Sequence, residues 1–315
     1  MDLFEQKQVK PMLIGVETEP FDDPAYIFEM KFDGERCVAY LDPKSGTELR
    51  NKRNVKMLPK VPELSELHQY VKTKCVLDGE LTCIGTDGKP VFHEIQRRSL
   101  MTNKLRIDFA AKQHPATFVA FDILYYKDKD VKSLPLMERK ALLQKAIKEE
   151  NARFAVSRYI EEQGSALFAA AKEQQLEGIV GKRKDSLYFE DKRTKDWKKV
   201  KFYLDDDFVI CGYIFKENNM ISIVLGQYRG SELIYKGHVT MGVSRKDFKI
   251  IQQQPEIAMP SFDFPAGHGN ENAVWIEPEL VCKVEFMERT QSGGMRQPRF
   301  QGIRMDKAAE DCVEK

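Results

Sequence analysis

A carboxylate and a primary amine stand two residues apart near the start of the chain, at Glu29 and Lys31. Side chains alternate along a strand, so the two groups would share one face of any strand that holds them. Strand-forming residues on either side of Asp33 and Gly34 predict a hairpin whose tight turn follows Lys31. This stretch alone leaves two interpretations open: an ion pair on the surface of a half-buried hairpin, or a reactive amine at a strand end.

Other charged side chains recur on or directly after apolar segments, where they could face one cleft. They are Arg36, Arg53, Glu80, Glu177, Arg193, Lys199 and Lys201. Arginine offers paired donors that suit phosphate, and carboxylates can hold Mg²⁺ together with substrate phosphates. A free lysine has a pKa of about 10.4, and neighbouring cations such as Lys199 and Lys201, together with desolvation, would lower it. The set therefore predicts phosphoryl or nucleotidyl transfer through a lysine.

The segments that must position these groups change character near residue 203. Before it, apolar runs predict strands at 26–30, 37–40, 75–77, 116–126, 176–183 and 196–202, and helices at 62–70, 135–150 and 165–175. The run 116–126 is nearly continuously apolar, as in a buried central strand. Beyond residue 203, short strands are predicted at 208–215, 221–228, 233–240 and 280–287, with one obvious helix at 245–254. This spacing is typical of a small β-barrel or sandwich.

The composition narrows the class of protein. The chain has 315 residues, 42% hydrophobic and 31% charged, enough for the cores of two domains. Six scattered cysteines without a C-x-x-C pair, and five scattered histidines, argue against zinc, disulfides or a histidine-based site. No apolar run is long enough to cross a bilayer, and the start lacks the pattern of a signal peptide. We therefore expect a cytoplasmic protein that does not bind membranes.

The net charge of +1 conceals two basic segments. Residues 182–201 carry nine basic and four acidic side chains, and residues 289–307 carry five basic side chains opposed by Asp306 alone. Such runs are often plain solvated surfaces. Two of them in an otherwise balanced chain favour a partner that bears phosphates.

The segment Lys31-Phe32-Asp33-Gly34-Glu35-Arg36 resembles the K-x-D-G-x-R signature of covalent nucleotidyltransferases, which include ATP-dependent DNA ligases, RNA ligases and capping enzymes. Lys52-Arg53-Asn54 resembles the S-R-N motif of these enzymes, with lysine in place of serine. Further segments resemble their remaining motifs in the same order, at 77–80, 121–125, 134–139, 177–182, 196–201 and 304–307. Over roughly residues 10–307 the likeness is greatest to the ligase domain of bacterial ATP-dependent DNA ligases of the end-joining type.

The resemblance implies a fold of the α+β class. Residues 1–203 would form an adenylyltransferase domain, ATP-grasp-like, with antiparallel sheets and flanking helices. Residues 204–315 would form a C-terminal OB-fold β-barrel, which agrees with the short strands read from the pattern.

The resemblance also implies a role for each residue around the nucleotide. Lys31 would be the catalytic nucleophile, attacking the α-phosphate of ATP and holding AMP as a phosphoramidate. Glu29 would accept a hydrogen bond from the adenine amino group, Phe121 would stack on adenine, and Glu80 would contact the ribose. Phe121 also allows a plain core position, because it lies in so apolar a strand.

The remaining roles concern phosphate and metal. Sugar or phosphate groups would be bound by Arg36, Arg53 and Arg193, the α-phosphate by Lys199 and Lys201, and the pyrophosphate by Arg304 and Lys307 when the second domain closes. Glu177, with Glu80 second, would hold a divalent metal, Mg²⁺ or alternatively Mn²⁺. Asp33 would shape its turn or lie near the 3′-hydroxyl of the substrate.

The implied reaction is the sealing of 5′-phosphate/3′-hydroxyl nicks in double-stranded DNA, in repair or end joining, by a monomer. Two alternatives stay open. An RNA ligase or a capping guanylyltransferase would use the same covalent chemistry on another substrate. A non-catalytic nucleic-acid-binding module built on the OB barrel would need no reactive lysine.

Overall fold

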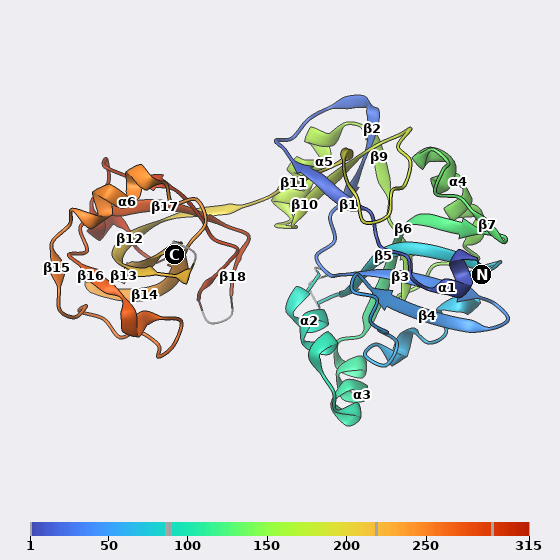
Figure 1. Ribbon diagram of the computed structural model, residues 1–315, viewed down its shortest axis with the longest axis horizontal. Coiled ribbons are helices and arrows are strands. Elements are labelled where there is room, and N and C mark those ends of the chain that lie inside the picture. The colour runs from blue at the N-terminus through green and yellow to red at the C-terminus, as the bar shows by residue number, and fades with distance from the viewer. Residues whose placement is uncertain (1, 86–87, 89, 218–219, 291–292, 315) are drawn as a thin grey trace. The chain divides into compact units, whose positions relative to one another are not determined.

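The computed structural model describes residues 2–85, 88, 90–217, 220–290 and 293–314, which form two compact units (Figure 1). Unit 1 spans Met1–Phe202 and unit 2 spans Tyr203–Lys315. Within the described ranges, no helix is long and apolar enough to cross a bilayer.

The first sheet of unit 1 is antiparallel except for one edge pair, β1 with β11. Helix α5 (Gly164–Glu173) packs against one face of this sheet, where Phe28, Ile179 and Val200 form an apolar cluster. Because side chains alternate, Glu29 and Val180 point to the opposite face. The strands lie in the order β1 (Leu13–Glu17), β11 (Arg193–Lys201), β10 (Gly178–Arg183), β2 (Asp23–Met30) and β9 (Tyr159–Glu162).

The second sheet of unit 1 contains the almost continuously apolar strand β6 at an interior position, as its sequence predicts. Helix α4 (Leu136–Ala146) packs on β6, and Leu77, Phe118 and Leu143 belong to the buried core beside it. The strands lie in the order β4 (Gly46–Asn51), β3 (Glu35–Asp42), β5 (Cys75–Cys83), β6 (Ala116–Tyr126) and β7 (Lys129–Asp130), with β8 (Phe154–Val156) parallel to β6.

The hairpin predicted around Asp33 and Gly34 is wrong. Strands β2 and β3 both exist, but β2 pairs with β10 and β9, whereas β3 pairs with β4 and β5. The backbone N–H of Lys31 donates to the Gly178 carbonyl at 2.9 Å, which keeps Lys31 on the first sheet. Gly34 then passes so close to the second sheet that an added Cβ would lie 2.2 Å from the Leu81 carbonyl oxygen. Lys31 therefore lies on a connection between two sheets.

Other predicted elements of unit 1 have different limits. Strand β5 does not end at Leu77 but continues to Cys83. Gly79 permits this close pairing with β6, because an added Cβ there would lie 2.5 Å from the Val119 carbonyl oxygen. The helix expected at 62–70 is two 3₁₀ turns, Pro62–Leu64 and Leu67–Tyr70. Three helices were not predicted: α1 (Leu3–Gln6), α2 (Phe92–Leu100) and α3 (Lys104–Gln113).

Unit 2 is a curled, mainly antiparallel sheet with helix α6 (Arg245–Gln252). Ser244 caps α6, and Phe248 and Ile251 enter the core of the unit beside Phe208. The sheet curls around β12, which pairs with β17 along its first half and with β13 and β16 along its second. Its strands are β12 (Leu204–Phe215), β13 (Ile221–Arg229), β14 (Glu232–Val239), β15 (Glu256–Ile257), β16 (Val274–Ile276), β17 (Val281–Phe286) and β20 (Arg299–Ile303), beside the hairpin of β18 (Glu288–Arg289) and β19 (Met295–Arg296).

An ion pair between Arg139 of α4 and Asp122 of β6 is fully buried in unit 1. The guanidinium donates to both carboxylate oxygens, at 2.8 and 2.9 Å. Asp122→Ala would leave an unpaired buried cation, so we expect the free energy of unfolding to fall by about 3–5 kcal/mol in urea titrations. Asp185→Ala, which removes the exposed partner of Arg183, should leave the unfolding midpoint nearly unchanged. Equal losses in the two variants would contradict this account.

Candidate active site

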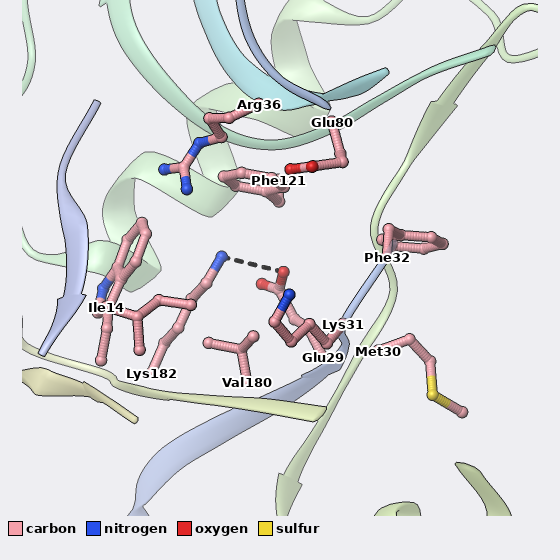
Figure 2. Close-up of a pocket in the computed structure, with 11 residues that line it drawn as sticks. Ile14, Glu29, Met30, Lys31, Phe32, Arg36, Glu80, Phe121, Val180 and Lys182 are labelled. Atoms are coloured by element: carbon pink, nitrogen blue, oxygen red, sulfur yellow. Dashed lines mark hydrogen bonds and ion pairs between the residues drawn. The ribbon is translucent and has the colours of Figure 1, made fainter. Parts of the chain in front are cut away.

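A cavity lies between the two sheets of unit 1, and the predicted nucleophile is on its wall (Figure 2). About 440 Å³ of space not filled by atoms lies at this cavity, including space that is open to solvent. Its lining comes from β1, β10 and β11, from β2 and the connection after it, and from β3, β5 and β6 of the second sheet. The lining residues are Ile14, Glu29, Met30, Lys31, Phe32, Arg36, Glu80, Phe121, Val180, Lys182 and Trp197.

The amine of Lys31 is bound to Glu177, which directly precedes β10. Lys31 Nζ donates to Glu177 Oε2 at 2.7 Å, and Lys201 Nζ lies 3.5 Å from the other carboxylate oxygen. Burial lowers the pKa of Lys201; Glu177 opposes this shift, and the charges of Lys31 and Lys199 add to it. Glu177 therefore links the candidate nucleophile to a second lysine on β11.

Gly178 makes this arrangement possible. Its φ is +136°, and an added Cβ would lie 2.0 Å from the Val200 carbonyl oxygen. Any other residue would push β10 away from β11 and would separate Glu177 from Lys201.

Glu29 does not form an ion pair with Lys31, so the surface-pair interpretation of the sequence is wrong. Glu29 is buried, with 2% of the residue exposed, and its carboxylate accepts from Lys182 Nζ and Ser157 Oγ, each at 3.0 Å. Lys140 of α4 forms an ion pair with the other carboxylate oxygen. Burial alone would raise the pKa of Glu29, but the charges of Lys140 and Lys182 outweigh it and hold this pKa below its ordinary value. Figure 2 shows Lys182 reaching Glu29 across the cavity floor.

Lys182 is a buried cation between two aromatic rings. Its amine lies 4.3 Å from the ring centre of Phe121 and 4.5 Å from that of Trp197, and its exposed fraction is 3%. Burial lowers the pKa of Lys182 to about 8, and Lys140 adds to this shift while Glu29 opposes it. The group is therefore close to its titration range at neutral pH.

Arg36 is fixed by a buried carboxylate on the neighbouring strand. Its guanidinium donates from Nε and Nη2 to the two oxygens of Asp78, both at 2.6 Å. Tyr188 also donates to Asp78, at 2.6 Å. This network holds the Arg36 guanidinium 4.6 Å from the ring centre of Phe121, so the planar cation and the ring form one wall of the cavity (Figure 2).

Glu80 enters the same cavity from β5. Burial raises the pKa of Glu80 to about 8; Arg36 and Lys31 oppose this shift, and Glu177 and Asp78 add to it. Glu80 and Glu177 are thus close enough for the charge on one to disfavour the charge on the other.

The other predicted residues of unit 1 lie outside the described cavity lining. Arg53 is exposed in the turn after β4, and Arg193 is exposed at the start of β11, where it donates to the Ile14 carbonyl. Lys199 forms an ion pair with Glu17 of β1 at 3.0 Å.

The two predicted residues of unit 2 share one anionic partner. Arg304 and Lys307 both donate to Asp207 of β12, at 3.3 and 2.8 Å, and Arg304 also pairs with Asp306. The side chains of Arg304, Lys307 and Asp207 are partly open to solvent, so these ion pairs are not buried.

Several side chains of the site received no role from the sequence. Lys182, Trp197 and Asp78 lie inside segments that resemble ligase motifs, at 177–182, 196–201 and 77–80, so their positions in these motifs could have indicated a place in the site. Lys140 follows the 134–139 segment directly. Ser157 lies between β8 and β9 and stands in no motif, so sequence reasoning had no means of finding it.

The carboxylates of the site suit a hard divalent cation. The described residues include no group of three or more histidine, cysteine, aspartate or glutamate side chains arranged for a metal. Glu177 and Glu80 supply two carboxylates beside the cavity, and Mg²⁺ is commonly held by one or two carboxylates with water and substrate phosphates. The donor set therefore fits Mg²⁺ that arrives with a nucleotide better than a metal held by protein alone.

Two protein families match the chain in order. Residues 12–201 match the family described as ATP dependent DNA ligase domain, and residues 216–307 match the ATP dependent DNA ligase C terminal region. The chain is 29% identical over 297 residues to the SPbeta prophage-derived DNA ligase-like protein LigB of Bacillus subtilis, covering 94% of this chain and 99% of that protein.

A longer relative covers a comparable share of this chain. The Multifunctional non-homologous end joining protein LigD of Pseudomonas aeruginosa is 28% identical over 312 residues, covering 95% of this chain but 35% of that protein. The chain thus spans about a third of the length of this relative.

A solved structure agrees with these matches. The mycobacterial DNA ligase D complexed with ATP and MES aligns with a TM-score of 0.56 and 23% identity over 100% of both chains. At this identity the likeness concerns the fold, and with the family matches it confirms an α+β adenylyltransferase domain followed by an OB-fold. The chain belongs to the family of ATP-dependent DNA ligases.

Proposed function

We propose that this chain seals nicks between a 5′-phosphate and a 3′-hydroxyl in double-stranded DNA through AMP carried on Lys31. The observation that carries the proposal is the position of Lys31. Lys31 lines the cavity between the two sheets, and its amine donates a hydrogen bond to Glu177 at 2.7 Å. The relatives named as end-joining proteins and DNA ligases support a role in DNA repair.

In the first step, the lone pair of Lys31 Nζ attacks the α-phosphorus of ATP. The bond from that phosphorus to its bridging oxygen breaks, and pyrophosphate leaves with the electron pair. Glu177 is placed to accept the proton that the amine loses. Mg²⁺ held by Glu177 and Glu80 would offset the negative charge of the phosphates.

The cavity provides a partner for each part of the nucleotide. Adenine would lie between Phe121 and Val180, which face each other across the space in Figure 2. It would displace the Lys182 amine, which lies over the Phe121 ring. Glu29 would accept from the adenine amino group, and Glu80 would contact the ribose. Arg36 would keep its donors to Asp78 and offer Nη1 to the sugar or phosphate.

The phosphates require further cations. Lys201 and Lys199 would neutralise the α-phosphate, with Glu17 and Glu177 as their partners when no nucleotide is bound. Arg193 and Arg53 would serve the sugar or phosphate groups of AMP or of the nick. Arg304 and Lys307 would bind the pyrophosphate after exchanging Asp207 for it.

Two further transfers complete the reaction. The 5′-phosphate at the nick attacks the AMP phosphorus and displaces the Lys31 amine. The 3′-hydroxyl, near which Asp33 would lie, then attacks the 5′-phosphorus and releases AMP. The basic segments 182–201 and 289–304 would contact the duplex backbone, so binding should weaken with salt and show little sequence preference.

Incubation with α-labelled ATP or α-labelled GTP, followed by a chase, tests this proposal. We expect ATP to label the protein and the label to pass to nicked DNA before it is released as AMP. Transfer to nicked RNA alone would favour an RNA ligase, and labelling by GTP alone would favour a capping enzyme. Absence of any labelled protein would contradict covalent catalysis.

A further inference from the structure

Lys140 is a buried cation that the chemistry proposed above does not use. It lies on α4, its exposed fraction is 4%, and it does not belong to the described cavity lining. Among the described residues, the anionic partner of its amine is Glu29, and the ring of Tyr159 lies 5.6 Å away. Burying an ammonium costs free energy unless a carboxylate compensates it, so the position of Lys140 depends on Glu29 being ionised.

The donors around Glu29 determine which of its acceptor sites a ligand can reach. An ionised carboxylate has about four lone-pair sites. Ser157 and Lys182 fill both sites on Oε2, at 3.0 Å each. Lys140 approaches Oε1, and the described residues place no other cation or hydrogen-bond donor on that oxygen. Oε1 is buried, so the acceptor site that a ligand in the cavity can reach is the Oε2 lone pair filled by Lys182, which lines the cavity.

We propose that Lys140 is a positioning residue that sets the base specificity of the cavity, by keeping Glu29 ionised when a nucleobase takes the place of Lys182 on Oε2. This inference rests on the proposed function, because it concerns the base of the nucleotide that labels Lys31. An ionised Glu29 can only accept, so the purine must donate at position 6. Adenine carries an amino group there, whereas hypoxanthine and guanine carry an oxygen that would face the carboxylate.

Lys182 cannot perform this task alone. Its amine also lies over Phe121 and Trp197, on the side of Glu29 where the nucleotide would bind. Lys140 approaches from α4 and stays outside the cavity lining, so its charge acts on Glu29 whether or not a nucleotide is present. The charge of Lys140 also lowers the pKa of Glu29 more than that of Lys182 does.

Adenylation with ATP and with ITP provides the test, because the two nucleotides differ at position 6 and its neighbouring ring nitrogen. We compare wild type, Lys140→Met, Lys140→Gln and Lys140→Arg with Lys145→Met, which makes the same change at an exposed site on the same helix. The rate of labelling is measured against nucleotide concentration. The sealing of nicked DNA by protein that already carries AMP is measured separately.

We expect Lys140→Met to lower the preference for ATP over ITP by about tenfold or more, through a higher KM for ATP. Sealing by pre-adenylated protein should be unchanged, Lys140→Arg should keep most of the preference, and Lys145→Met should equal wild type. If Lys140→Met does not fold, Lys140→Gln, which keeps a polar donor without the charge, should show the same loss. An unchanged preference in the folded neutral variant overturns the inference while leaving the proposed function intact, whereas wild type that accepts no label from ATP overturns both.

Discussion

Lys31→Ala should abolish the transfer of AMP from ATP to the protein, with a fall of at least about a thousandfold in the rate of labelling. Alanine removes the atom that forms the phosphoramidate, and the other lysines of the site are held by carboxylates or aromatic rings. Labelling with α-labelled ATP, followed by peptide mapping of the wild type, measures the effect and locates the AMP. Lys44→Ala, in the exposed turn before β4, should label at the wild-type rate.

The same variant separates the chemical steps. Lys31→Ala should still seal a nick whose 5′-phosphate already carries AMP, since that step needs no lysine nucleophile. Labelled Lys31→Ala, or AMP mapped to a different lysine in the wild type, would contradict the proposed mechanism. Loss of sealing on the pre-adenylated nick as well would show that Lys31 contributes to more than its own adenylation.

Glu177→Gln should produce the second largest loss, about a hundredfold or more in the rate of adenylation. The carboxylate accepts from Lys31, lies beside Lys201, and is the first candidate ligand for Mg²⁺, whereas an amide is a neutral, weaker ligand. Single-turnover labelling over a range of Mg²⁺ concentrations would measure this loss. We also expect a chelator to stop the labelling of wild type and added Mg²⁺ to restore it.

A change of the same kind at Glu173, exposed at the end of α5, is the matched control for Glu177. Glu173→Gln should keep the wild-type rate and the wild-type response to Mg²⁺. Full activity in Glu177→Gln would show that neither the proton of Lys31 nor the metal depends on this carboxylate.

The motif positions that could be predicted from sequence are those whose side chains face the cavity. Glu29 and Glu80 meet there because alternation along β2 and β5 fixes which face each side chain takes, and Lys31 reaches the cavity from the connection that follows β2. Phe121 lines the cavity although most of its strand is buried in the core, because one face of β6 is turned toward the cavity and the other toward the core. For these residues, the motifs that the sequence resembles were needed in addition to the local pattern.

Long-range pairing was not predictable in the same way. The Asp33-Gly34 dipeptide favours a turn, but it does not determine whether the next strand returns to the same sheet, and here it does not. Lys140 and Ser157 meet Glu29 across 111 and 128 residues of chain, and no spacing rule reaches that far. Helix α3 escaped prediction because it leaves Leu105 and Phe109 exposed, which blurs its amphipathic pattern.

The four-residue connection between β2 and β3 places the nucleophile at the cavity and also ties it to the first sheet. The backbone of Lys31 is anchored to the first sheet through Gly178, whereas Phe121 and Glu80 belong to the second sheet. A nucleotide joined covalently to Lys31 and stacked on Phe121 would therefore brace the two sheets against each other. The adenylated chain should be the stiffer form, and the transfer of AMP from Lys31 to the 5′-phosphate would loosen unit 1 before the strand is sealed.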